Sequence, residues 1–379
     1  MTVFFGFSRG DDFRTDFKCL SCLKAFFPCA QMLALTATSP PSAIERLAKS
    51  LCMNSNFKTI QKNPNRENVF LDKKMRLPNQ HGTTSYERIL IPIAEELSEK
   101  RETYPITIIY MRLKYCGFAY ALFNRILEDD QFVGNSRDPS SRLFAQFHAP
   151  QTAQMKVSIL NEIKKDDSRI RVIFATTALG MGVNVPYVSK IIHIGPPSSL
   201  ESYMQEIGRA GRIGQQASAI LYFNNSDIAQ NKDIIDDSIR EYCTSEKVCL
   251  RKLLLGYFGF SCKKQEKCCV ICDGEFTPSI SNVDMSKLSL RKKVRNMPAH
   301  NAEFLFEEIK FVVKKYMSNV DQYSIIYYPT VDSDYIAKKI LDEIYFIETE
   351  RDLLEIYGIW DENCSSALFN LITMYAPLA

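Results

Sequence analysis

The chain has 379 residues, a formal net charge of +3 and 46% hydrophobic residues, which supplies ample material for buried cores and excludes a strongly basic or acidic protein. No apolar run approaches the roughly 20 residues that a membrane-spanning helix needs, and the start lacks the basic-then-apolar pattern of a signal peptide. We expect a soluble, membrane-free protein of roughly two to three domains. Its twelve cysteines do not predict disulfides, because these are rare in cytosolic or nuclear proteins of this size.

Apolar segments in the middle of the chain alternate with helical patterns. A helix is expected over roughly 86–100, and strands over 106–110, 172–175, 190–194 and 219–223. Between the last two strands, Ser198-Ser199-Leu200-Glu201 resembles a capping box that opens a helix. This rhythm predicts an α/β domain with a doubly wound parallel sheet, whose functional loops follow the carboxyl ends of the strands.

The capped helix carries the run Gln205-Glu206-Ile207-Gly208-Arg209-Ala210-Gly211-Arg212. Two arginines among small residues suit a surface that closes on a polyphosphate, since guanidinium groups stabilise spreading negative charge and glycines let the backbone approach. A solvated helix face is the plainer alternative. The Thr- and Gly-containing loop that follows the strand at 172–175 favours the phosphate interpretation.

Five cysteines crowd between Cys249 and Cys272. Cys249 begins an amphipathic segment that ends in glycine, Cys262 follows in a lysine-rich loop, and Cys268, Cys269 and Cys272 close the segment. A Cys-x₂-Cys knuckle formed by Cys269 and Cys272, joined to two upstream cysteines, predicts a structural Zn²⁺ site. Buried free thiols are the alternative, and either Cys262 or Cys268 remains for the fourth position.

Two clusters of basic residues offer local positive charge. The first contains Arg251, Lys252, Lys263, Lys264 and Lys267, which are able to neutralise several phosphates. The second contains Lys287, Arg291, Lys292, Lys293 and Arg295, which suggest a nuclear-import signal, a DNA contact or a solvated linker.

The end of the chain has a different character. A linker is expected over 274–287 and helices over 302–317, 334–347 and 364–375. We expect a small all-α region that docks a protein partner or contacts DNA.

The segment 172–228 resembles the second motor domain of RecQ-family DNA helicases, which belong to superfamily two. Residues 175–186 are similar to the family's fifth motif, with Val185 in place of a frequent lysine, and 205–212 to its sixth. The resemblance implies that Arg209, Arg212 and Gln205 act on ATP held by a partner domain, with Arg212 as the arginine finger. It implies ATP contacts from Gly180 and Asn184 as well, and places Thr176 and the two glycines Gly180 and Gly182 between nucleotide and DNA.

The resemblance extends over about 8–273. Residues 106–110 resemble the fourth motif, and Phe147-His148-Ala149 the loop after it, although a surface histidine is the plainer reading of His148. The run from Gly10 to Phe17 resembles an aromatic-rich DNA-sensing loop, with Arg9 in place of an expected tryptophan, and Leu33 to Thr38 the third motif. The implied DNA-binding residues are Arg14, Thr38, Thr176 and His148. The implied zinc ligands are Cys249, Cys262, Cys269 and Cys272, with Cys268 in reserve.

The resemblance divides the chain into a remnant of a first RecA-like motor domain (1–75), a second RecA-like domain (76–228), a zinc-binding subdomain (229–275), and a linker with a helical domain (276–379). The sequence contains neither Gly-x-x-x-x-Gly-Lys-Ser/Thr nor Asp-Glu-x-His, the elements that hold phosphate and Mg²⁺. We therefore expect ATP and Mg²⁺ to bind only in a more complete protein, and this chain alone not to hydrolyse ATP.

The resemblance implies an ATP-dependent 3′–5′ DNA helicase of recombination and repair, located in the nucleus, that acts on single-stranded DNA, tailed duplexes or junctions. The alternatives are a non-catalytic DNA-binding product that keeps the zinc platform, and a zinc-containing protein-interaction module.

Overall fold

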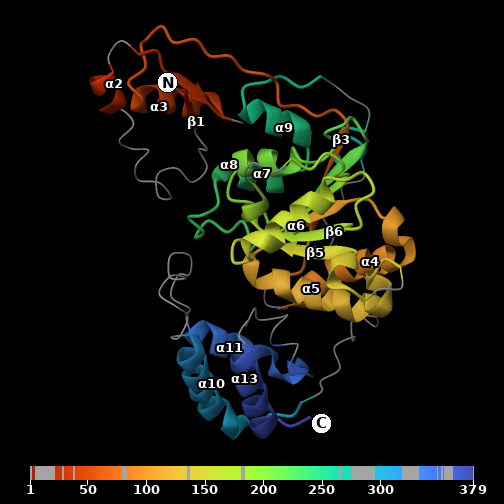
Figure 1. Ribbon diagram of the computed structural model, residues 1–379. Coiled ribbons are helices and arrows are strands. Elements are labelled where there is room, and N and C mark those ends of the chain that lie inside the picture. Colours follow the sequence, from red (N-terminus) through yellow and green to blue (C-terminus); the bar gives the residue numbers. More distant parts are fainter. Residues whose placement is uncertain are drawn as a thin grey trace. The chain divides into compact units, whose positions relative to one another are not determined.

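The computed structural model of the chain describes most of its residues. The described parts are 2–4, 22–27, 30–36, 39–78, 83–134, 137–180, 184–263, 267–274, 295–317, 333–347, 349–350, 353 and 362–378. They fall into two compact units, the first made of Met1–Asn79, Pro105–Thr107 and Asn184–Ser281, and the second of Gln80–Tyr104, Ile108–Val183 and Asn282–Ala379. Figure 1 follows the chain from red at the N-terminus to blue at the C-terminus.

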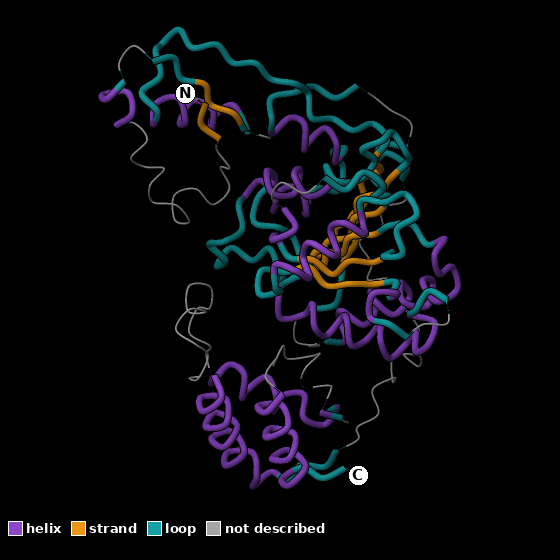
Figure 2. Tube along the Cα trace, in the orientation of Figure 1, coloured by secondary structure: helices purple, strands orange, loops and turns teal. Residues whose placement is uncertain are grey.

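Six strands form a sheet in the order β3-β8-β7-β4-β6-β5. Figure 2 draws the strands in orange. Their bounds are β3 Val69–Met75, β4 Thr107–Tyr110, β5 Phe144–Phe147, β6 Val172–Ala175, β7 Lys190–Ile194 and β8 Ala217–Phe223. The pairs β3–β8, β7–β8 and β5–β6 are parallel. Parallel neighbours need crossover connections, which helices supply here. The predicted α/β fold with a parallel sheet is confirmed.

Three short helices of the first unit pack beside one another (Figure 1). They are α7 (Leu200–Ile207), α8 (Asp237–Thr244) and α9 (Leu250–Tyr257), and α9 contacts both of the others. Helices of this length are marginal alone. Their buried side chains, such as Tyr203, Tyr242 and Leu254, therefore supply the stability that propensity does not.

A buried lysine joins α8 to the sheet. Lys73 of β3 is 1% exposed, and its Nζ donates to the carbonyl oxygens of Tyr242 at 3.2 Å, of Cys243 at 2.8 Å and of Ser245. Carbonyls at a helix C-terminus lack intrahelical donors and carry partial negative charge, so the ammonium group satisfies them. Burial lowers the pKa of Lys73 to about 8.

An internal ion pair closes the same unit. Arg76 follows β3 and donates from Nε to Oδ2 of Asp227 at 3.0 Å and from Nη2 to Oδ1 at 2.8 Å. Both side chains are nearly inaccessible, at 3% and 2% exposure. The bidentate geometry compensates the free-energy cost of removing both charges from water. Removing one partner of such a buried pair costs about 3–5 kcal/mol, because the other charge is left unpaired.

The strands of the second unit are covered on both faces. Every residue of β4 and β6 is buried, and successive side chains of a strand point to opposite faces. The helices of this part are α4 (Thr84–Lys100), α5 (Leu113–Leu127) and α6 (Ala153–Ile163), and α5 contacts α4, β5 and β6. Phe123 of α5 packs edge-to-face against Phe174 of β6, with ring centroids 4.8 Å apart.

The N-terminal elements are short. They are β1 (Thr2–Phe4), α2 (Cys22–Phe26), β2 (Leu33–Leu35) and α3 (Pro41–Ser50), and β1 pairs with β2 in parallel. The predicted DNA-sensing loop with Arg14 lies outside the described residues, as does Thr38.

The C-terminal residues form the predicted helical region. Helices α10 (Ala302–Met317), α11 (Ser333–Glu343) and α13 (Glu362–Tyr375) share a core that includes Ile309, Ile340 and Leu368. None of the helices in the described ranges combines the length and apolar character needed to cross a membrane.

The expectation of an exposed basic cluster is wrong for Arg295. Its side chain is 2% exposed and donates to the carbonyl oxygens of Ile347 and Ala376, the latter at 2.8 Å. The guanidinium group satisfies carbonyls at element ends, so it is part of the helical core. The other basic residues of this cluster lie outside the described residues.

Candidate functional sites, an arginine loop and a cysteine cluster

The arginine run starts at the end of α7. Ser199 caps this helix, one residue later than the capping box Ser198-x-x-Glu201 implies, and its Oγ accepts from the Ser202 N–H at 3.3 Å. The helix ends at Ile207, and residues 208–215, here called the arginine loop, form turns. Gly211 adopts φ +66°, a left-handed conformation that favours glycine.

The structure brings Arg212 together with Asn184, a residue of the motif upstream. Arg212 donates from Nη1 to Oδ1 of Asn184 and from Nε to the carbonyl oxygen of Gly208 at 3.3 Å. Asn184 is exposed and Arg212 is half-buried. An amide and a carbonyl that share one guanidinium group restrict its rotamers, which preorganises a positive charge for an incoming anion.

Arg209 and Gln205 are less accessible than expected for a phosphate-facing surface. Arg209 is 3% exposed, and Gln205 is half-buried on α7. The neighbouring Glu206 is also buried, and its Oε2 lies 2.8 Å from Nε2 of His193 on β7. An anion arriving from solvent therefore meets Arg212 before Arg209.

Two further predicted residues lie in the second unit. The Thr176 N–H donates to the Phe147 carbonyl at 3.2 Å, and its Oγ1 accepts from the Ala178 N–H at 3.3 Å. Gly180 ends the 3₁₀ helix η7 (Thr177–Gly180). Both belong to the loop that follows β6, at the carboxyl end of a strand as predicted, whereas Gly182 lies outside the described residues.

His148 follows β5 and is buried, with 7% exposure. Its backbone N–H donates to Oε1 of Gln151 at 3.1 Å, and Nε2 lies 3.3 Å from Oε1 of Gln146. Burial, followed by the charge of Lys156, lowers the pKa of His148 to about 4. The imidazole is thus neutral near pH 7 and does not offer a cation to DNA phosphates.

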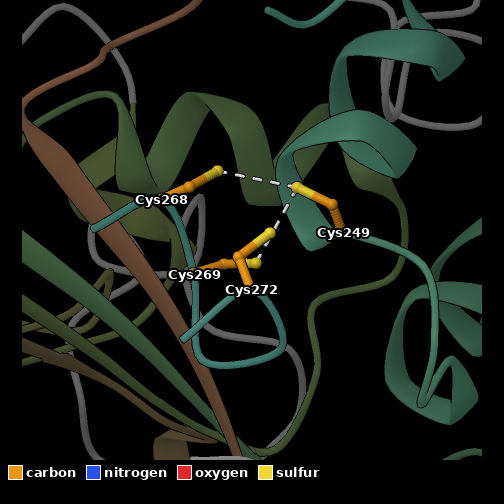
Figure 3. Close-up of side chains that lie close together, drawn as sticks. All are labelled: Cys249, Cys268, Cys269 and Cys272. Atoms are coloured by element: carbon orange, nitrogen blue, oxygen red, sulfur yellow. Dashed lines mark hydrogen bonds between the residues drawn. The ribbon is translucent and has the colours of Figure 1, made fainter. Parts of the chain in front are cut away.

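Four cysteine sulfurs converge in the first unit (Figure 3). Cys249 stands at the N-cap of α9, and Cys268, Cys269 and Cys272 come from the turn that follows. All four sulfurs lie within 4.8 Å of one another, with 3.5 Å from Cys249 to Cys268 and 3.8 Å from Cys249 to Cys269. Three of these residues are buried or half-buried, and Cys272 is exposed.

These residues fit a tetrahedral zinc ion. A Zn–S bond of about 2.3 Å places the sulfurs of a tetrahedral site about 3.8 Å apart, as found for Cys249 and Cys269. The hydrogen bond with Cys249 and burial raise the pKa of Cys269 to about 12, and burial raises the pKa of Cys272 to about 11. Deprotonating Cys269 and Cys272 near neutral pH therefore requires a cation, which a bound Zn²⁺ would supply as a structural ion.

The predicted ligand set is corrected at one position. Cys268 belongs to the cluster and Cys262 does not. Cys262 is half-buried, and its thiol lies against the carbonyl oxygen of its neighbour Lys263 at 3.2 Å. Cys268, whose carbonyl oxygen accepts from the Leu71 N–H of β3, is the residue whose sulfur lies against that of Cys249.

Arg251 is a structural residue, although its charge suggested a phosphate contact. It is 3% exposed and donates from Nε to the Cys268 sulfur at 3.3 Å. Its Nη1 donates to Oδ1 of Asn65 at 2.8 Å and to the Arg66 carbonyl at 2.7 Å, while Nη2 donates to the Val69 carbonyl. Sequence reasoning missed this role because the acceptors are backbone groups far away in the chain. Lys252, Lys263 and Lys267 of the same cluster are exposed, and Lys264 lies outside the described residues.

Comparison with known proteins gives a match to one family model. Residues 99–214 match the helicase conserved C-terminal domain, a range that includes the loop after β6 and both arginines of the arginine loop.

Several of the curated proteins that are similar to this chain are RecQ-like DNA helicases. The chain is 29% identical to ATP-dependent DNA helicase Q-like 2 of Arabidopsis thaliana over 74% of its own length and 38% of the relative's. It is 26% identical to ATP-dependent DNA helicase Q1 of Mus musculus over 69% of its length and 39% of the relative's. The predicted resemblance to the RecQ family is confirmed, and the chain spans less than half the length of these two relatives.

Among solved structures, the DEAD-box helicase Mss116 bound to ssRNA and UDP-BeF matches 94% of this chain and 62% of its own, with 17% identity and a TM-score of 0.47.

The cysteine correction can be tested by two single substitutions. We expect wild-type protein and Cys262→Ser to bind one Zn²⁺ per chain, and Cys268→Ser to lose the metal, because only Cys268 lies in the sulfur cluster. Metal analysis after gel filtration with a weak chelator measures this. Retention of zinc by Cys268→Ser together with its loss in Cys262→Ser would restore the ligand set predicted from the sequence.

The buried histidine predicts a pH dependence of stability. Because the pKa of His148 is lower in the folded chain, the unfolded chain binds more protons between pH 6.5 and pH 4. Stability is therefore complete above pH 6.5 and is lost as the pH falls, by about 2 kcal/mol from pH 7.5 to pH 5. Urea unfolding of wild type and His148→Gln should show this loss in the wild type only. Acid effects on the cysteine cluster occur equally in wild type and His148→Gln, so the difference between the two proteins isolates His148. Parallel plots of unfolding free energy against pH would contradict the lowered pKa of His148.

Proposed function

We propose that this chain is the C-terminal motor half of an ATP-dependent DNA helicase, in which Arg212 acts as arginine finger toward ATP held by a separate nucleotide-binding domain. The observation that carries the proposal is the pairing of Arg212 with Asn184 in a chain whose relatives are RecQ-like helicases. Hydrolysis would build negative charge on the γ-phosphate, which a preorganised guanidinium group stabilises.

The remaining roles follow from the same proposal. Arg209 and Gln205 would support the nucleotide-facing surface from α7, and Gly180 and Thr176 would couple the nucleotide to DNA. The proposal includes four domains, at 1–75, 76–228, 229–275 and 276–379. It also includes unwinding in the 3′–5′ direction, action in recombination and repair, and a nuclear location. The resemblance to RecQ helicases supports each of these points. Zn²⁺ would be a structural ion held by the cysteine cluster.

Turnover tests the arginine finger. We expect no DNA-stimulated ATP hydrolysis by the chain alone, since its sequence has no phosphate-binding Gly-x-x-x-x-Gly-Lys-Ser/Thr element. Fusion behind the nucleotide-binding domain of a RecQ helicase should restore turnover, and Arg212→Ala should then reduce kcat by about 10³-fold or more.

The control for this experiment is Arg137→Ala, because Arg137 is an exposed arginine whose side chain is 76% accessible. It should leave turnover unchanged. Hydrolysis by the chain alone that disappears in Arg212→Ala would show that no second domain is needed. Equal turnover of the fusion with and without Arg212 would remove the proposed role and favour a non-catalytic DNA-binding module.

Salt dependence tests the DNA partner. Lys252, Lys263 and Lys267 are exposed and lie between Cys249 and Cys268 in the sequence. Each phosphate contact on single-stranded DNA contributes about 0.7 to the slope of log K against log salt. We expect the triple change of these lysines to glutamine to lower that slope by about 2, measured by fluorescence anisotropy on tailed duplex DNA.

A matched triple variant changes Lys49, Lys58 and Lys62, which are also exposed, to glutamine. It removes the same charge from the same unit and should keep the wild-type slope. Equal slopes in all three proteins, or no salt-sensitive binding at all, would favour a protein-interaction module over a DNA-binding one.

A further inference from the structure

A short segment at the start of β3 lies between the two functional sites of the first unit. Residues 65–69, here called the linking segment, bind Arg251, which in turn donates to the Cys268 sulfur of the cysteine cluster. The segment also contacts the arginine loop directly, through Asn68. No motif of the sequence singled out this segment.

The contacts on the cluster side converge on Arg251 and Cys268. Arg251 binds Asn65, Arg66 and Val69 of the linking segment as well as the Cys268 sulfur. Backbone hydrogen bonds also join the cysteine turn to β3. The Leu71 N–H donates to the Cys268 carbonyl at 3.3 Å, and the Val270 N–H donates to the Leu71 carbonyl at 3.0 Å. The chain that bears three of the four cysteines is thus fastened directly to the start of β3.

The contacts on the loop side are made by Asn68. Its Nδ2 donates to the carbonyl oxygen of Gly211 at 2.8 Å and to that of Gln215 at 2.7 Å. Its own carbonyl accepts from the Ala217 N–H at 2.8 Å. Both amide protons of the side chain therefore hold the two ends of the turn that contains Arg212.

Gly211 leaves room for this arrangement. A Cβ atom at position 211 would lie 2.3 Å from Nδ2 of Asn68, a distance that non-bonded atoms do not reach. The loop is also held from the opposite side, where Gln215 donates from Nε2 to the carbonyls of Pro186 and Val188 at 3.0 and 3.2 Å. The Arg212 turn thus has few ways to move while Asn68 stays in place.

We propose that Asn68 is a positioning residue for Arg212 and that the linking segment makes the order of the arginine loop depend on the metal in the cysteine cluster. The role of Arg212 as arginine finger rests on the proposed function. The coupling between the cysteine cluster and the order of the arginine loop does not depend on that role. Loss of the metal frees residues 268–272, and the contacts of Cys268 with Arg251 and Leu71 go with it. The linking segment then loses its support, and Asn68 no longer holds Gly211 and Gln215 in a fixed position.

Hydrogen exchange of the full chain tests the coupling. In zinc-loaded protein, Asn68→Ala should accelerate exchange in 209–216 about tenfold, because two hydrogen bonds to this turn are lost, while one Zn²⁺ stays bound. In the wild type, removal of the metal by a chelator should accelerate exchange in 268–273 and in 209–216. The same removal from Asn68→Ala should add little in 209–216, since the connection is already broken.

The matched control is Asn224→Ala. Asn224 lies just beyond the other end of β8, and its Nδ2 also donates to a backbone carbonyl, that of Leu77 at 2.8 Å. This substitution should leave exchange in 209–216 unchanged. Asn68→Asp, which keeps the shape but loses the donors, should behave like Asn68→Ala if the hydrogen bonds matter.

Two results would overturn the proposal. One is unchanged exchange in 209–216 in both Asn68 variants, which removes the positioning role. The other is an arginine loop that keeps its protection when the metal leaves and 268–273 opens. Neither measurement uses nucleotide or DNA, so a failed ATPase experiment does not decide this one.

Discussion

A single buried guanidinium group connects helix α9, the start of β3 and the turn that carries Cys268. Arg251 satisfies backbone carbonyls of a segment more than 180 residues away and a cysteine sulfur at the same time. Isolated buried charges are costly unless every donor finds an acceptor. We therefore expect loss of Arg251 to disturb three elements together: the start of β3, helix α9 and the cysteine turn. The arginine loop depends on the first of these, because Asn68 precedes β3 and binds Gly211 and Gln215.

Local patterns account for the elements that were predicted well. The strands at 107–110, 172–175 and 190–194 are apolar runs that end at turns, and the C-terminal helices show apolar residues at helical spacing. The start of α7 was predicted to within one residue, because serine before an apolar helix is a preferred N-cap residue. In each case the signal lies within a few residues of the structure that it predicts.

The errors share a different cause. Arg251 and Arg295 stand in basic runs, so the sequence suggested exposed cations, but both satisfy carbonyls brought near by the tertiary fold. The sequence offered both Cys262 and Cys268 as the fourth ligand, and the structure distinguishes them through the hydrogen bond that joins Cys268 to β3. Asn68 carried no signal, because an asparagine before a strand resembles an ordinary turn residue until the carbonyls of Gly211 and Gln215 appear beside it.

The uneven exposure of the cysteine cluster has a chemical consequence. Cys268 and Cys269 are buried and Cys249 is half-buried, but Cys272 faces solvent. Dissolved peroxide or a competing thiol therefore reaches Cys272 before it reaches the two buried cysteines. Oxidation of Cys272 alone would remove one of the four thiolates available to the proposed Zn²⁺, while Cys268 and Cys269 would remain chemically intact.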